Sequence, residues 1–157
     1  MEFTKLDTLS LYLFDKTNDE DIIFIKNICG DTSIKKWFQG ITIGLLTNKN
    51  QDFFDHGFIV KENNEYIGYI GISNFNIEES SVYLRAAILK DKRGLSYGET
   101  LLAEITDYIF DNYTNVESIR LKIAKENIPS LQTANACDYK WLKDDIYIKY
   151  NPNLVRS

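Results

Sequence analysis

The sequence predicts an α/β fold of the α+β type, built on a mostly antiparallel sheet. Three β-type runs with short connections, residues 57–62, 65–73 and 81–89, indicate a meander. A long amphipathic helix pattern follows them, which indicates a helix packed on that sheet. Ten Tyr and nine Phe residues against two Pro also favour a sheet-rich or mixed fold over disorder.

Length and charge limit the number of domains and the kinds of partner. The chain has 157 residues and no linker or repeat, so we expect a single domain over residues 1–157. A nucleic-acid-binding protein needs a basic surface, whereas this chain has a formal net charge of −5, so we expect no nucleic-acid partner. The acidic excess suits a cationic partner such as an amine, although such an excess more often serves solubility alone.

The N-terminal third predicts one strand and one helix. Leucines alternate within residues 3–14, which indicates a strand. Thr17 or Asn18 can cap a helix whose first turn is acidic and whose end is marked by Gly30. A second short helix is expected over residues 32–38.

A polar loop and a hairpin follow. Residues 47–56 indicate the loop, and Asn63–Asn64 indicate a tight turn between two strands because Asn tolerates positive φ. Gly68 and Gly71 inside the second of these strands indicate either close approach by another backbone or a ligand, or tight packing against a helix.

The C-terminal half predicts the longest helix and the remaining strands. The helix begins near Tyr97 and carries one apolar stripe, namely Leu101, Leu102, Ile105, Tyr108, Ile109 and Tyr113. A strand is expected over residues 117–124, and then a short helix entered through Pro129. The tail indicates a hairpin that turns at residues 143–145.

Cysteine and histidine usage excludes several kinds of site. Cys29 and Cys137 form no CxxC pair, and His56 is the only histidine, so we expect neither a disulfide framework nor a metal site. A nucleophilic pair of Cys137 and His56 is the alternative to a core cysteine, which we favour. The sequence pattern indicates neither a signal peptide nor a membrane span, so we expect a cytoplasmic protein without a membrane partner.

The stretch KDKRGLSYGETLLAEI, residues 90–105, can be interpreted in two ways. It runs from a strand through a basic loop with two glycines into the long helix, and unpaired N–H groups at a helix start bind phosphate well. Ser96 and Glu99 also match a capping box, which would satisfy two of those N–H groups internally. A Walker A loop is excluded because Glu99, not Lys, follows Gly98, and a dinucleotide fingerprint is excluded because it has three glycines in a parallel unit.

The segment RGLSYG, residues 93–98, resembles the Arg/Gln-x-x-Gly-x-Gly/Ala signature of the GNAT N-acetyltransferase superfamily, with Ser96 in place of the first glycine. The segment NIPSLQTANACDYKW, residues 127–141, is similar to the Asn-x-x-Ser/Ala helix of that family, with Asp138–Tyr139 where Gly-Phe is usual. Residues 24–38 also resemble the subgroup of ribosomal-protein N-terminal acetyltransferases.

The resemblance implies a mixed sheet that splays open between its fourth and fifth strands, here residues 82–89 and 118–124, and acetyl-CoA as co-substrate. It implies that the pantetheine arm lies in the splay, that the pyrophosphate meets backbone N–H groups of the basic loop, and that Ser130 approaches the sulfur. The implied cofactor-binding residues are Ile88, Leu89, Arg93, Gly94, Leu95, Ser96, Tyr97, Gly98, Asn127 and Ser130.

The catalytic acid and base depart from the family pattern. Many relatives carry a Tyr seven residues after the motif Asn, where this chain has Ala134, so Ser130 or water becomes the candidate proton donor. Many also carry a Glu base on the fourth strand, where this chain has Val82 or Tyr83. Glu79 and Tyr83, with Glu78 beside them, are then the candidate bases, and any of them could act directly or through water. The alternative is that these residues only form a solvated hairpin tip.

We therefore expect an N-acetyltransferase that moves an acetyl group directly from acetyl-CoA to a primary amine. The amine could belong to a protein N-terminus, a polyamine, an aminoglycoside or another small molecule, and a homodimer is compatible with this function. The missing Tyr and strand Glu keep two alternatives open. One is a non-catalytic acyl-CoA-binding module, and the other is a scaffold in which residues 93–98 only start a helix.

Overall fold

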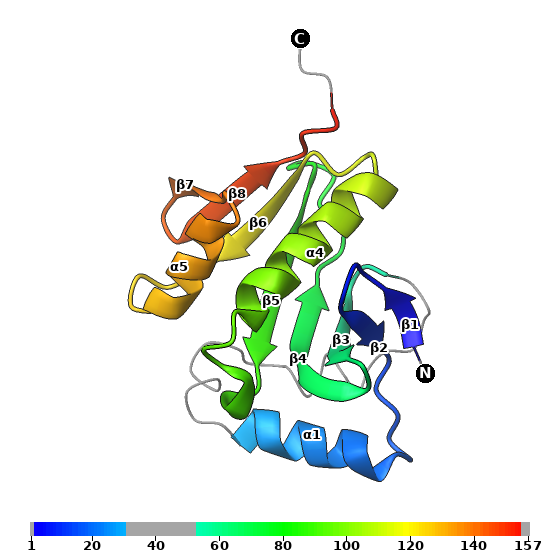
Figure 1. Cartoon of the computed structure of the whole chain (residues 1–157). Helices are drawn as coiled ribbons and strands as arrows, with labels where there is room; N and C mark the ends of the chain where they lie inside the picture. The colour runs from blue at the N-terminus through cyan, green and yellow to red at the C-terminus, as the bar shows by residue number, and fades with distance from the viewer. Residues whose placement is uncertain (1, 31–52, 155–157) are drawn as a thin grey trace.

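The computed structural model describes residues 2–30 and 53–154. The strands within these residues form one sheet, in the order β1-β2-β3-β4-β5-β6-β8-β7. Every neighbouring pair is antiparallel except β5 and β6, which run parallel. Figure 1 shows α4 crossing one face of this sheet and α1 lying at the end of β4 and β5. The predicted α+β architecture with a mostly antiparallel mixed sheet is confirmed.

The strands and helices lie close to the predicted ranges. The strands are β1 (Glu2–Lys5), β2 (Ser10–Tyr12), β3 (His56–Glu62), β4 (Glu65–Ile72), β5 (Ser81–Ile88), β6 (Ser118–Lys122), β7 (Lys140–Lys143) and β8 (Ile146–Tyr150). The helices are α1 (Asp19–Gly30), the 3-10 turn η1 (Lys90–Lys92), α4 (Tyr97–Asn112) and α5 (Ile128–Ala136). The helix expected over residues 32–38 and most of the loop expected over 47–56 lie outside the described residues.

The N-terminal segment differs from the prediction, because residues 3–14 form two short strands and not one. The chain reverses between β1 and β2, where the N–H of Leu6 donates to the carbonyl of Leu9 at 2.8 Å. The turn is held by Glu104 of α4, whose carboxylate accepts from the N–H groups of Thr8 at 2.7 Å and Leu9 at 3.0 Å. This contact spans more than ninety residues of sequence, so local alternation could not indicate the reversal.

The side chains of the sheet divide into two faces, here called the α4 face and the α1 face. Alternate residues of β5, from Val82 and Leu84 on, pack with the apolar stripe of α4 in the larger core cluster. Ala87 belongs to the opposite side, with Ile59 and Tyr69, where α1 contributes Phe24 and Ile28. Tyr83 and Arg85 have the same parity as Ala87 and therefore lie on the α1 face.

Of the two glycines, Gly68 is approached by another backbone as predicted, whereas Gly71 is approached by a side-chain ring, which was not predicted. A Cβ at Gly68 would lie 2.2 Å from the backbone oxygen of Ala87, so at this position another backbone approaches. A Cβ at Gly71 would lie 2.6 Å from the hydroxyl oxygen of Tyr69, so there a ring approaches. The Asn63–Asn64 turn is also as predicted, with φ values of 51° and 67°.

Candidate functional site

The central parallel pair of strands separates part of the way along its length. The ladder between β5 and β6 runs from Ser81 opposite Ser118 to Leu84 opposite Leu121. Beyond Leu84, β5 continues to Ile88 in contact with β4 alone, while β6 stays paired with β8. Figure 1 shows the two strands diverging. The expected splay is therefore present, and it lies one strand later in the count because the N-terminal segment forms two strands.

The backbone groups that face the splay follow from the hydrogen-bond alternation of β5. The N–H of Leu89 donates to the carbonyl of Ile67 on β4 at 2.9 Å, and the carbonyl of Leu89 accepts from Lys92. Residues of the other parity, Ala86 and Ile88, therefore direct their backbone groups away from β4 and toward the splay. Ala86, which was not predicted, and Ile88, which was, therefore have backbone groups on the splay side, whereas the N–H and carbonyl of Leu89 are bonded within the chain.

The basic loop enters α4 without a side-chain cap. Ser96 occupies the cap position in the left-handed conformation, with φ 64° and ψ 15°, and its side chain makes no capping hydrogen bond. The predicted capping box of Ser96 and Glu99 is therefore wrong, because a capping serine needs an extended backbone. The first N–H groups of α4 have no acceptor within the helix and none from a cap, so they are available to a ligand.

Contacts with the β3–β4 hairpin hold this loop in place. The Tyr97 hydroxyl donates to Glu62 Oε1 at 2.9 Å, and Lys92 pairs with Glu65. These hydrogen bonds raise the pKa of Tyr97 and of Lys92, so the phenol stays neutral and the amine stays charged. Lys92, one of the basic residues of the loop, thus already has a carboxylate partner within the chain.

Arg93 and Gly98 occupy opposite ends of the loop. Arg93 Nε donates to the carbonyl of Ile88 at 3.1 Å, which brings its guanidinium to the edge of the splay. The N–H of Arg93 donates to the carbonyl of Lys90 at 3.4 Å and is not free for phosphate. A Cβ at Gly98 would lie 3.5 Å from Thr133 Oγ1, an ordinary contact, so packing within the chain does not demand glycine there.

The start of α5 is capped by the motif asparagine. Asn127 Oδ1 accepts from the N–H of Ser130 at 3.4 Å. Asn127 is therefore the cap, and the Ser130 hydroxyl has no hydrogen-bond partner among the described residues. Ala134, at the position where relatives carry a Tyr, is buried and offers no proton donor.

The departure from the usual Gly-Phe pair after α5 has a structural explanation. Asp138 adopts a left-handed conformation with φ 66°, which glycine reaches easily and Asp tolerates. Tyr139 is buried in the core, and its hydroxyl lies 2.6 Å from Thr106 Oγ1 on α4. The hydroxyl that distinguishes Tyr139 from the usual Phe therefore has a hydrogen-bond partner. Burial raises the pKa of Tyr139, so the phenol stays neutral.

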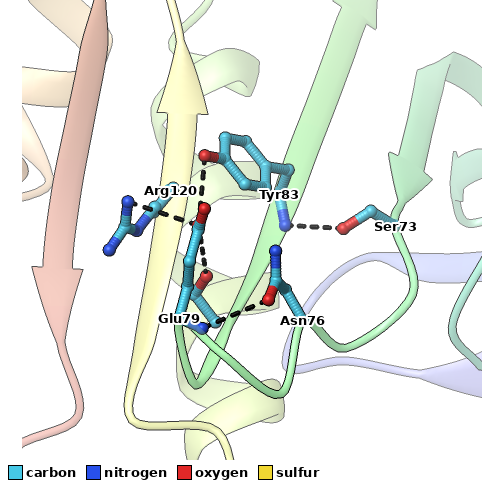
Figure 2. Close-up of polar contacts among 6 residues, drawn as sticks. Ser73, Asn76, Glu79, Tyr83 and Arg120 are labelled. Carbon is cyan, nitrogen blue, oxygen red and sulfur yellow. Dashed lines mark hydrogen bonds and ion pairs between the residues drawn. The ribbon is translucent and has the colours of Figure 1, made fainter.

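Glu79 and Tyr83, two of the three predicted catalytic residues, lie together (Figure 2). Glu79 Oε2 accepts from the Tyr83 hydroxyl at 3.3 Å and from Ser81 Oγ at 3.2 Å, and it lies 3.3 Å from Arg120 Nη1. The N–H of Glu79 donates to Asn76 Oδ1 at 3.1 Å, which orients the hairpin tip. These contacts argue against a merely solvated tip. No contact joins Ser130 to this cluster within the part of the chain that the structure describes.

Arg120 is the member of this cluster that the sequence interpretation missed. It lies on β6 opposite Tyr83 of β5, and its side chain is only 15% exposed. Its Nε atom is buried and has no hydrogen-bond partner. In the sequence Arg120 alternates with apolar residues as an exposed strand residue does, so only the parallel pairing of β5 and β6 indicates its role.

The alternative nucleophile is not supported. Cys137 is buried, donates its thiol to the carbonyl of Glu99 at 3.5 Å, and has a pKa raised by burial, which makes it a poor nucleophile. Among the described residues, no group of three or more His, Cys, Asp or Glu side chains could hold a metal ion. None of the described helices is both long and apolar enough to cross a membrane.

Comparison with known proteins identifies a family. The sequence pattern of the acetyltransferase (GNAT) family matches residues 24–139. No curated protein matches the chain.

Many solved structures share the fold. An acetyltransferase (GNAT family) from Bacillus anthracis superposes with a TM-score of 0.75 at 15% identity, over 96% of this chain and 99% of that one. A spermidine N-acetyltransferase from Vibrio cholerae, in complex with CoA and spermine, gives 0.67 at 19% identity over 92% and 96%. A Vibrio cholerae protein described as a ribosomal-protein-serine acetyltransferase gives 0.68 at 15% identity over 96% and 97%.

Proposed function

The chain belongs to the acetyltransferase (GNAT) family, and from this premise we propose that it transfers an acetyl group from acetyl-CoA directly to a primary amine. Acetyl-CoA is the co-substrate of this family and supplies the acetyl group as a thioester. The observation that carries the proposal is the splay between β5 and β6 beside a helix start without a side-chain cap. β1, β2 and β8, which lie outside residues 24–139, join the same sheet, which supports one domain over residues 1–157.

The chain offers donors for each part of the co-substrate. The N–H groups of the loop and helix start, residues 94–98, would hold the pyrophosphate, with Arg93 supplying a positive charge at the edge of the splay. Ala86 and Ile88 would bond the pantetheine arm in the manner of a sheet, in place of Leu89. Asn127 and Ser130, at the start of α5, would flank the arm near its sulfur.

We assign the proton transfers to residues on either side of the splay. A strand N–H facing the splay would polarise the thioester carbonyl. Ser130, whose hydroxyl is uncommitted among the described residues, would give a proton to the departing thiolate. Glu79 would take the proton of the amine through water, using Oε1, because Oε2 is occupied by Ser81, Tyr83 and Arg120. Tyr83 and Arg120 would position that carboxylate.

A second function, a non-catalytic acyl-CoA-binding module, is favoured by one observation. Ala134 is buried where relatives carry the tyrosine that donates a proton, so the usual acid is absent. The two functions share the co-substrate and differ only in whether an amine reacts.

Acetyl-CoA should raise the melting temperature of the purified protein. At a hundredfold excess over Kd the added stability is about 2.7 kcal/mol. Release of free thiol on adding a panel of amines, comprising peptides, polyamines and aminoglycosides, then separates the enzyme from the binding module. A melting temperature unchanged by millimolar acetyl-CoA contradicts both functions, and a thermal shift without thiol release favours the binding module.

Glu79→Gln should lower kcat/KM for the amine about 100-fold, because general-base assistance contributes factors of this size. Glu78→Gln is the matched control, since Glu78 is its exposed neighbour and should keep wild-type activity. Thermal melts of both variants show whether removing the charge beside Arg120 also weakens the fold. Wild-type kcat/KM in a folded Glu79→Gln variant would remove Glu79 from the reaction.

A further inference from the structure

We infer that Arg120 selects the acceptor by binding a carboxylate that lies next to the reacting amino group, as in an α-amino acid. The inference rests on the proposed transfer to an amine and names the chemical class of that amine. It depends on the unused hydrogen-bond donors of Arg120, on its contact with Glu79, and on its place beside the splay.

The guanidinium of Arg120 is largely enclosed by the fold but makes no hydrogen bond. Its side chain is only 15% exposed, and its Nε atom is buried without a hydrogen-bond partner. Among the described residues, its one polar contact is with Glu79 Oε2, which also accepts from Ser81 and Tyr83. A guanidinium has five N–H donors, so most of these donors have no use within the described chain. Buried donors without a partner call for an explanation in a native protein, and a bound oxygen ligand supplies one.

The unused donors share one edge of the guanidinium. Glu79 lies 3.3 Å from Nη1, whereas Nε and Nη2 point together from the other edge. Nη2 has no hydrogen-bond partner among the described residues and is not a buried atom, so this edge is reached from the surface at Nη2. Two parallel donors of this kind match the two oxygens of a carboxylate.

Arg120 lies beside the point where the splay opens. It is paired with Tyr83, and only one further pair, Leu84 with Leu121, joins β5 and β6 before the strands separate. Paired residues project from the same face of a sheet, so the side chain of Arg120 lies with Tyr83 on the α1 face. Figure 2 shows the Glu79 carboxylate between Tyr83 and Arg120. One strand residue advances about 3.3 Å, so a small molecule can reach from Arg120 into the splay.

The adjacent charges of Glu79 and Arg120 match an amine that carries its own carboxylate. In the proposed reaction Glu79 Oε1 takes the proton of the amine through water, and Arg120 contacts Oε2 of the same group. An acceptor whose amine faces Glu79 therefore places the atoms next to its amino group beside Arg120. An α-amino acid has its carboxylate there, whereas a polyamine has methylene groups and a further cation, which Arg120 would repel.

The neighbouring strand favours an aliphatic side chain on this amino acid. In the β6–β8 register Arg120 is paired with Ile148, and Lys122 is paired with Ile146. Paired residues lie on the same face, so two isoleucines flank the two cations of β6. Leucine is therefore a suitable acceptor with which to test the inference.

The acidic first turn of α1 lies too far away to cancel the charge of Arg120. Asp21 accepts from the Tyr66 hydroxyl, and Glu20 lines a small cavity together with Tyr66 and Leu89. Leu89 follows Tyr83, the partner of Arg120, by six residues, or roughly 20 Å of extended chain. This separation exceeds the distance of about 8–10 Å over which salt screens exposed charges.

Three forms of one acceptor test the inference on the wild-type protein. Leucine, leucinamide and 3-methylbutylamine share a side chain and an amino group, but carry a carboxylate, a neutral amide or neither. With saturating acetyl-CoA, we expect kcat/KM for thiol release to be at least tenfold higher for leucine than for leucinamide, the range of a hydrogen bond to a charged group. Equal values for leucine and 3-methylbutylamine, or a preference for spermidine over leucine, would overturn the inference.

Arg120→Lys tests the residue, because it keeps a positive charge beside Glu79 but lacks the edge with two donors. Poorer positioning of Glu79 would lower kcat/KM for all acceptors alike, so the readout is the ratio of leucine to leucinamide. We expect this ratio to fall about tenfold. Lys122→Gln is the matched control, since it removes the next cation on the same face of β6, and it should keep the wild-type ratio. An unchanged ratio in a folded Arg120→Lys variant would remove Arg120 from acceptor selection.

Calorimetry separates failure of this inference from failure of the proposed function. Leucine is titrated into each variant in saturating CoA, and a thermal melt of each shows that it is folded. Leucine binding that is weakened in Arg120→Lys and retained in Lys122→Gln supports the inference even if no acetyl group is transferred. Acetyl transfer to a peptide or to spermidine without leucine binding overturns the inference and leaves the proposed function standing.

Discussion

Gly98→Asp is expected to abolish acetyl-CoA binding while leaving the fold intact. The new carboxylate would stand in the first turn of α4, where the pyrophosphate is proposed to bind, and would repel it. We expect Kd to rise at least 100-fold, equivalent to about 2.7 kcal/mol. The folding stability should be unchanged or slightly higher, because an acidic residue near a helix N-terminus interacts favourably with the helix dipole.

Gly98→Asn is the matched control for Gly98→Asp. It has the same size without the charge, so it separates steric from electrostatic effects. Its Cβ would make only an ordinary contact with Thr133, 3.5 Å away, so it should fold normally. Calorimetric titration with acetyl-CoA and a thermal melt of each variant are the measurements. Retained binding by Gly98→Asp would place the phosphate site elsewhere.

Gly68→Ala is expected to have the largest effect on stability. The added methyl group would lie 2.2 Å from the backbone oxygen of Ala87, and backbone cannot move aside as a side chain can. We expect a loss of about 3 kcal/mol or more in the free energy of unfolding. Because the displaced strand is β5 next to Ala86 and Ile88, any protein that still folds should also bind acetyl-CoA more weakly.

Gly30→Ala provides the comparison for Gly68→Ala, since a Cβ at Gly30 would meet no atom within 4 Å. It should be neutral or slightly stabilising, because Ala favours helices more than Gly does. Chemical denaturation of both variants gives the two free energies. Equal stabilities would mean that β4 and β5 are farther apart than the structure shows.

Local patterns were sufficient for most elements of the fold. The Asn63–Asn64 turn, the apolar stripe of α4 and the hairpin at the C-terminus each depend on residues close together in sequence, and each was predicted correctly. The N-terminal segment was not, because its reversal depends on Glu104, a residue far along the chain that accepts the N–H groups of the turn. The Ser96 capping box failed for a related reason, since the pattern of residue types cannot show that Ser96 is left-handed.

The sequence by itself determined the family, through residues 93–98 and the helix after residue 127, and with it the place where acetyl-CoA is expected. Only the tertiary structure decided which side chains and backbone groups face the splay, where acetyl-CoA is expected. The parallel pairing of β5 and β6 brings Arg120 to Tyr83 and Glu79, and the register of β4 with β5 turns Leu89 away and directs Ala86 and Ile88 inward. The physical reason is that strand pairing joins residues tens of positions apart, and a shift of one residue moves every side chain to the other face. Residues 90–105 also needed the tertiary structure, because the sequence allowed either a self-capped helix start or a phosphate site. In the structure Ser96 is left-handed, so the first N–H groups of α4 have no side-chain cap.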